Sequence, residues 1–143
     1  MPIESPLHAL HVAAGAKFAD FAGWSMPLEY TGVVSEHNAV REAVGVFDVS
    51  HLGTLMVRGP LDVLNTVLTN DLGRLADGQA QYTLCLNESG GVVDDLIAYR
   101  ISDREFLLIP NAANCAEVAE RLGRSGLSVS DVTREIAIIA VQG

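Results

Sequence analysis

Two adjacent carboxylates, Asp94 and Asp95, are the first candidates for chemistry in this sequence. They lie in the stretch 81–100, where two runs rich in strand-forming residues flank the turn sequence NESGG at 87–91. This pattern predicts a β-hairpin. Carboxylates are unusual inside a strand, and a conflict between local pattern and residue type often marks a functional position.

Strand alternation places the two aspartates on opposite faces of this hairpin. The residues on the face of Asp95 are Val93, Ile97, Tyr99 and Ile101. The face of Asp94 ends in Arg100, so we expect it to be the more solvated. A carboxylate in an apolar wall has a raised pKa, which would suit Asp95 to proton transfer or to binding an N–H donor. The alternative, that both aspartates flank a turn and face water, stays open.

Composition limits the classes of function. The chain has 143 residues, of which 49% are hydrophobic and 19% are charged, with a net charge of -9. This is typical of one folded domain, and the scattered basic residues argue against a nucleic-acid partner. No apolar run is long enough to span a membrane and no signal peptide is visible, so we expect a cytoplasmic protein with no membrane partner. Cys85 and Cys115 are expected to be small buried residues.

Four other residues could form a site by their spacing. His8 and His11 lie three apart on a helix predicted within residues 5–15, but no further ligand completes a site, so no metal is predicted. Asp48 and His51 could form a catalytic dyad, although no nucleophile is evident.

Two asparagines precede a predicted helix. Asn114 with Glu117 resembles a capping box, which would make Asn114 the N-cap. Asn111 is not needed for that cap and is therefore freer to bind a ligand.

The remaining pattern predicts a mixture of helices and strands. Helices are expected near 6–14, 33–44, 60–68 and 114–122, and strands near 16–21, 46–48, 54–58, 82–86, 92–99, 105–109, 127–132 and 136–141. The segment 23–30 is expected to be an irregular aromatic loop. Because short turns join several strands, we expect an α+β fold with a largely antiparallel sheet and packed helices.

Several motifs together resemble a known family. The motifs are DFAGWSMPL at 20–28, FDVSHLG at 47–53, Tyr82, GGVVDDLI at 90–97 and NAAN at 111–114. In this order and spacing they are similar to the aminomethyltransferases of the glycine cleavage system, the T-proteins. Members of that family are much longer, so the resemblance implies that residues 1–143 are the N-terminal folate-binding region of a multidomain enzyme, truncated before the rest.

The resemblance also implies an activity. T-proteins move a methylene group from the aminomethyl-lipoyl arm of H-protein to tetrahydrofolate and release ammonia. Asp95 corresponds to the key catalytic carboxylate of the family, and Tyr82 and Asn111 correspond to folate contacts. Leu52 stands where the family more often has methionine and would supply an apolar contact.

Two other functions remain open for this fold. One is a folate-dependent demethylase, and the other is a non-catalytic folate-binding module. The chain alone is expected to be inactive, because further folate contacts of the family lie beyond residue 143.

Overall fold

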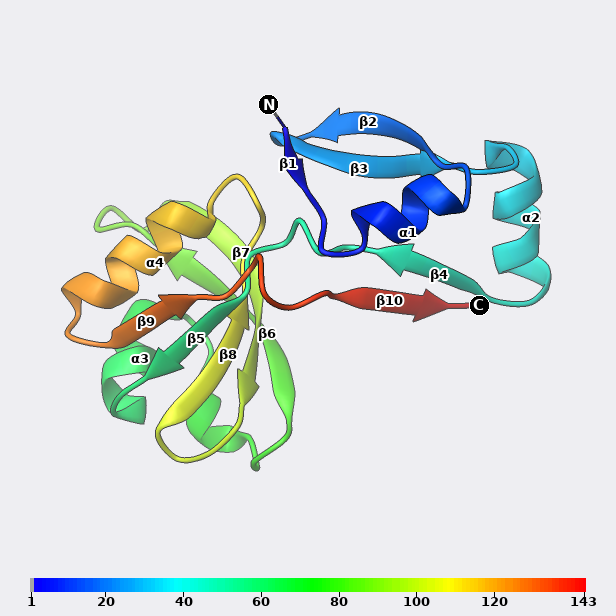
Figure 1. Cartoon of the computed structure of the whole chain (residues 1–143). Helices are drawn as coiled ribbons and strands as arrows, with labels where there is room; N and C mark the ends of the chain where they lie inside the picture. The colour runs from blue at the N-terminus through cyan, green and yellow to red at the C-terminus, as the bar shows by residue number, and fades with distance from the viewer. Residues whose placement is uncertain (1) are drawn as a thin grey trace. The chain divides into compact units, whose positions relative to one another are not determined.

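The computed structural model describes residues 2–143, which form two compact units (Figure 1). Unit 1 comprises the chain up to His51 together with Arg134–Gly143, and unit 2 comprises Leu52–Thr133. The length alone led us to expect one domain. The expected α+β class is confirmed, because both units combine helices with mainly antiparallel strands.

Unit 2 is built on a five-stranded antiparallel sheet with the order β6-β7-β8-β5-β9. The strands are β5 (Leu55–Arg58), β6 (Ala80–Leu86), β7 (Val92–Arg100), β8 (Glu105–Ile109) and β9 (Ser128–Asp131), and the helices are α3 (Leu61–Val67), the 3-10 helix η1 (Leu72–Arg74) and α4 (Cys115–Arg124). One face of the sheet packs on α3 and α4 and forms the core, to which Leu64, Phe106 and Leu122 contribute. Cys85 and Cys115 are buried there, as expected.

The predicted hairpin is confirmed as β6 and β7, paired in antiparallel register. The outer edge of β6 is covered by a short segment of its own unit. Thr69 donates its backbone N–H to Leu84 O (3.0 Å) and accepts the Leu84 N–H at its hydroxyl (3.1 Å). Asn70 donates its side-chain amide to Tyr82 O at 2.6 Å. This edge of the sheet is therefore closed to further strands.

Unit 1 contains two smaller sheets and two helices. Its strands are β1 (Ile3–Glu4), β2 (Lys17–Phe21), β3 (Trp24–Glu29), β4 (Gly45–Asp48) and β10 (Ile139–Gln142), and its helices are α1 (His8–Ala13) and α2 (Val33–Glu42). β3 lies between β1 and β2, with a parallel β1–β3 pair, and β10 pairs antiparallel with β4. The strand predicted at 136–141 corresponds to β10, which begins at Ile139 and thus later than expected.

The loop expected at 23–30 is wrong, because most of it is strand β3. Phe21 pairs with Trp24 across the two-residue turn Ala22-Gly23, in which both residues have positive φ (52° and 83°). Such turns match the twist of a hairpin. Pro27 is tolerated because β1 pairs with β3 only through Trp24 and Ser25, so the strand is an edge at the proline.

The two helices of unit 1 differ from expectation in detail. Ser5 does not cap α1. Its hydroxyl instead accepts the N–H of Leu7 at 3.0 Å, and Leu7 is the residue directly before the helix, which begins at His8. The apolar side expected on α2 is present in sequence but uncovered, since none of its residues is buried. Of the helices in residues 2–143, none is long and apolar enough to cross a membrane.

Candidate functional site

The structure reverses the expected faces of the Asp94-Asp95 pair. Asp94 is only 2% exposed and shares the helix-packed face with Leu96 and Ala98, whereas Asp95 lies on the opposite, exposed face. The expected burial of Asp95 is therefore wrong. The prediction relied on Arg100, which shares the face of Asp94. Arg100 lies at the end of β7 and donates to Asp77 Oδ1 (2.9 Å) and to Leu75 O (3.1 Å), so this face can be buried along the rest of the strand.

Asp94 is a buried carboxylate with a complete set of donors. Its oxygens accept the backbone N–H of Asn111 (2.9 Å), the side-chain amide of Asn111 (3.0 Å) and that of Asn114 (2.6 Å). These bonds offset the cost of burying the charge. Asn114 is the N-cap residue of α4, as expected, but the capping box does not form, because the Asn114 side chain makes no cap bond and Glu117 pairs with Arg121 at 2.8 Å. Asp94 thus fixes the loop between β8 and α4.

Asp95 forms a polar cluster with Tyr82 and Asn111 on the open face of the sheet. The Tyr82 hydroxyl donates to Asp95 Oδ2 at 2.7 Å, and the Asn111 amide donates to Asp95 O at 3.0 Å and lies 3.2 Å from Oδ1. The hydrogen bond to Asp95 raises the pKa of Tyr82, so its phenol stays protonated at neutral pH. Three residues separated in sequence are therefore brought together.

Leu52 lies beside the loop that carries Asn111. It is half-buried, and the next residue, Gly53, donates its N–H to Pro110 O at 2.8 Å. A Cβ added at Gly53 would lie 2.5 Å from Cys115 Sγ and 2.7 Å from Pro110 Cγ. Only glycine allows the two backbones to approach this closely, which keeps Leu52 next to the cluster's loop.

The surroundings of the cluster are apolar. Ile97 and Tyr99 of β7 are exposed on the same face as Asp95, and Leu107 and Ile109 of β8 are half-buried beside them. An apolar sheet face supports a flat ring, and a carboxylate with a neighbouring amide orients N–H groups on that ring. The arrangement is suited to a planar heterocycle that carries N–H donors.

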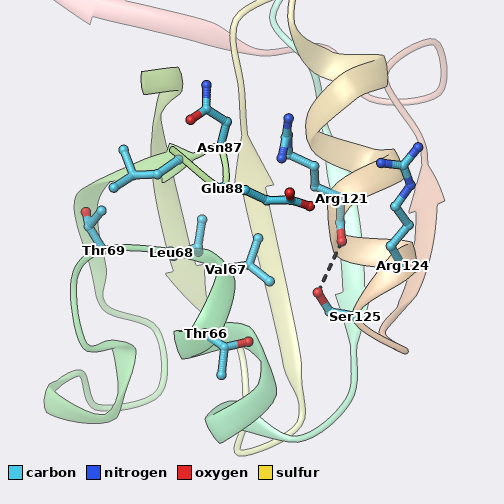
Figure 2. Close-up of a pocket in the computed structure, with 10 residues that line it drawn as sticks. Thr66, Val67, Leu68, Thr69, Asn87, Glu88, Arg121, Arg124 and Ser125 are labelled. Atoms are coloured by element: carbon cyan, nitrogen blue, oxygen red, sulfur yellow. Dashed lines mark hydrogen bonds between the residues drawn. The ribbon is translucent and has the colours of Figure 1, made fainter. Parts of the chain in front are cut away.

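A separate open groove of about 490 Å³ lies between α3, the tip of the β6–β7 hairpin and the end of α4 (Figure 2). Arg121 and Arg124 project from α4 on one side of it, where Glu88 points toward Arg121, and Thr66 and Thr69 lie on the other side. Both guanidinium groups are paired with glutamates one turn earlier on α4, Arg121 with Glu117 and Arg124 with Glu120. Each arginine thus already has a carboxylate partner, and none of the candidate residues lines this groove.

Asp48 in unit 1 bonds with His11 rather than with His51, so these two residues do not form the catalytic dyad that their spacing allowed. The Asp48 side chain is 1% exposed and accepts hydrogen bonds from Ser5 Oγ, His11 Nε2 (2.7 Å) and the Ser50 N–H (2.9 Å). His11 Nδ1 in turn lies 2.7 Å from the Tyr30 hydroxyl. Within residues 2–143, no three side chains of the usual metal-binding types are grouped.

The buried Asp48 predicts a specific acid sensitivity. Burial raises the pKa of Asp48, but the hydrogen bonds from Ser5, Ser50 and His11 outweigh it, so the folded pKa lies below the ordinary 3.8. The ionised carboxyl therefore stabilises the fold above pH 3.8, and this contribution is lost as the pH falls through the lower folded pKa. We expect Asp48→Asn to cost about 1–3 kcal/mol at pH 7 and less at pH 3, which is below the ordinary pKa of 3.8.

The measurement is urea unfolding at both pH values, followed by the fluorescence of Trp24, the single tryptophan, which lies in the same unit. Asp103→Asn, at an exposed carboxyl, is the control. A stability difference between wild type and Asp48→Asn that is the same at pH 7 and pH 3 would contradict the expectation.

Comparison with known proteins identifies the relatives of this chain. The family described as "GCVT N-terminal domain" matches residues 7–143. An aminomethyltransferase of Mycobacterium tuberculosis is 57% identical over 146 residues, which cover 99% of this chain and 40% of that protein. One from Parafrankia sp. is 58% identical over 147 residues, covering 98% of this chain and 40% of the relative.

A solved structure agrees with the sequence relatives. The crystal structure of glycine cleavage system aminomethyltransferase T from Bartonella henselae superposes with a TM-score of 0.87 at 38% identity, covering 100% of this chain and 41% of that one. The chain thus spans about two fifths of the length of the relatives it matches. By sequence and by fold, the chain belongs to the GCVT N-terminal domain family, whose matched relatives are aminomethyltransferases.

Proposed function

We propose that this chain is the folate-binding part of a tetrahydrofolate-dependent aminomethyltransferase of glycine cleavage. The donor is the aminomethyl group carried on the dihydrolipoyl arm of H-protein, and the acceptor is tetrahydrofolate. The observation that carries the proposal is the cluster of Tyr82, Asp95 and Asn111 on an apolar sheet face. The family relationship supplies the reaction class.

The reaction needs a group that manages protons on folate nitrogens. Bridging two nitrogens with one methylene forms two C–N bonds, breaks the C–N bond to ammonia and the C–S bond to the lipoyl arm, and releases two N–H protons. One proton ends on ammonia and the other on the lipoyl sulfur. Asp95 would accept a hydrogen bond from the attacking nitrogen and stabilise the positive charge that develops there.

The neighbours of Asp95 would hold it in place for that role. Tyr82 donates to one carboxylate oxygen and Asn111 to the backbone and the other oxygen, so the carboxylate is oriented before a ligand arrives. Leu52, beside the same loop, would contact the ring of the folate through its apolar side chain.

A calorimetric titration with a stable reduced folate tests the proposal. The wild-type chain is expected to bind and the Asp95→Asn variant to bind more weakly. If neither binds, the same comparison moves to a chimera in which residues 1–143 are followed by the remaining part of the Mycobacterium tuberculosis relative. Equal binding by wild type and variant in the chimera would contradict a role for Asp95.

The Tyr82 hydroxyl is expected to contribute less than Asp95 itself. Tyr82→Phe removes one hydrogen bond at an exposed position, and we expect folate affinity to fall by about 3- to 10-fold. Tyr99→Phe is a matched control, because it removes a tyrosine hydroxyl from the same sheet face without a bond to Asp95. The same calorimetric titration measures both variants, and an equal loss in the two would contradict a specific role for Tyr82.

A further inference from the structure

The backbone on either side of Leu52 is held by hydrogen bonds. The residue after it, Gly53, donates its N–H to Pro110 O at 2.8 Å. Two residues before it, the N–H of Ser50 donates to Asp48 Oδ1 at 2.9 Å. Leu52 therefore lies between two fixed points of the chain, and the path between them is only three residues long.

The first of these fixed points is a turn closed by the Asp48 side chain. An aspartate that accepts the N–H two residues further on forms an Asx turn, which restricts the intervening backbone. The hydroxyl of Ser50, which is fully buried, accepts the N–H of Ile138 at 3.0 Å. The N–H of Val49 donates to Ile138 O at 3.0 Å. The backbone of this turn is thus held from two sides.

The second oxygen of the Asp48 carboxylate keeps the side chain itself in place. Oδ2 accepts hydrogen bonds from Ser5 Oγ and from His11 Nε2 (2.7 Å), and the side chain is 1% exposed. His11 is oriented in turn by the Tyr30 hydroxyl, 2.7 Å from its Nδ1. With Oδ2 fixed, Oδ1 is presented to the N–H of Ser50 in one orientation.

We propose that Asp48 is a positioning residue for folate, acting on Leu52 through the turn at Ser50; this rests on the proposed function, in which Leu52 contacts the folate ring. A side chain on an ordered backbone loses less conformational freedom when a ligand binds. Without the turn, folate would have to order the segment from His51 to Leu52 itself. Because the ring contact is present before and during the reaction, the effect falls on KM for tetrahydrofolate rather than on kcat.

Kinetics of two Asp48 variants test this in the chimera of residues 1–143 with the remaining part of the Mycobacterium tuberculosis relative. Asp48→Ala removes the acceptor of the Ser50 N–H and is expected to raise KM for tetrahydrofolate by about 3- to 10-fold at unchanged kcat. Asp48→Asn keeps an oxygen that can accept this N–H, so its KM should stay within about 3-fold of wild type. A purely structural role would reduce the amount of active enzyme and so lower the apparent kcat at an unchanged KM.

A double-mutant cycle shows whether Asp48 acts through Leu52. Leu52→Ala removes most of the apolar side chain and is expected to raise KM by about 10-fold. Adding Asp48→Ala to it should raise KM no further, because the side chain to be positioned is then absent. If the chimera is inactive, the affinity for a stable reduced folate, from calorimetric titration, replaces KM in the same cycle.

Glu29→Ala is the matched control. Glu29 is a carboxylate of the same unit that also accepts a backbone N–H, that of Val33 at 3.1 Å, but it belongs to β3 and not to the turn before Leu52. Its loss should leave KM unchanged. If Asp48→Ala does not fold, as judged by circular dichroism, Ser50→Ala takes its place, since it removes the hydroxyl that accepts the Ile138 N–H from the same turn.

Amide exchange in the 143-residue chain tests the turn without folate or activity. The N–H of Ser50 is expected to exchange at least about 10-fold faster in Asp48→Ala than in wild type, Asp48→Asn or Glu29→Ala. An unchanged exchange rate in Asp48→Ala would overturn the proposal, because the turn would then not depend on this carboxylate.

Three kinetic outcomes would also overturn it. One is an unchanged KM in Asp48→Ala, and another is a KM in the double variant that rises by the product of the two single effects. The last is an unchanged KM in Leu52→Ala, which would leave no contact to position. In each case a weaker binding of folate by Asp95→Asn would still support the proposed function, whereas equal binding by wild type and Asp95→Asn would count against that function itself.

Discussion

Replacing Asp95 with asparagine is expected to lower kcat/KM for aminomethyl transfer by about 10²- to 10⁴-fold, the usual contribution of a positioned acid–base group. The amide keeps the size of the side chain and can still accept from Tyr82, so the cluster should persist. What is lost is the negative charge that the proposed function places next to the folate nitrogen. Activity is measured in the chimera of residues 1–143 with the remaining part of the Mycobacterium tuberculosis relative, using lipoylated H-protein and tetrahydrofolate as substrates.

The control for this experiment is Asp103→Asn, which removes an exposed carboxyl from the connection between β7 and β8 in the same unit. It should leave kcat/KM unchanged. Full activity in Asp95→Asn would favour a non-catalytic folate-binding module. Activity of the wild-type chimera with a methylated amine but not with H-protein would instead favour a demethylase.

Asp94→Ala is expected to destabilise the chain by about 2–5 kcal/mol, because it leaves buried donors without their acceptor. The substitution removes the Asp94 oxygens that accept three hydrogen bonds. The donors are the backbone N–H and the side-chain amide of Asn111 and the side-chain amide of Asn114. Urea unfolding followed by circular dichroism gives the free energy of unfolding. Asp94→Asn, which keeps one oxygen acceptor, is expected to lose less than Asp94→Ala.

Asp103→Ala is the matched control for this loss and should change the free energy of unfolding by less than about 0.5 kcal/mol, as exposed substitutions usually do. An effect of Asp94→Ala no larger than that of the control would mean that the loop between β8 and α4 does not depend on Asp94. It would also remove the structural reason for the position of Asn111.

Local patterns were sufficient to predict most elements of the fold. The turn at 87–91 and the two flanking strands are adjacent in sequence, so the hairpin of β6 and β7 could be predicted with nearly correct ends. The strand β3 could not, because its turn, Ala22-Gly23, lacks the asparagine or aspartate that usually marks a two-residue hairpin turn. Pro27 is also a residue that strands exclude except at edges.

The candidate site shows where local reasoning fails. Alternation correctly separated Asp94 from Asp95, but which face packs on the helices depends on α3 and α4, which are distant in sequence. The bond of Asp48 to His11 likewise joins positions 37 apart. Tyr82 became a candidate only through the family resemblance. Asn111 was singled out before the resemblance as freer to bind a ligand, but no spacing rule relates either residue to Asp95.

The position of β5 in its sheet has a consequence for how the unit forms. β6, β7 and β8 follow one another along the chain and can pair as soon as each is available, whereas β5 pairs with β8 on one side and with β9 on the other. Its partners are synthesised long after it. We therefore expect the meander of β6 to β8 to nucleate folding, with β5 held back until β8 arrives and the sheet completed last by β9.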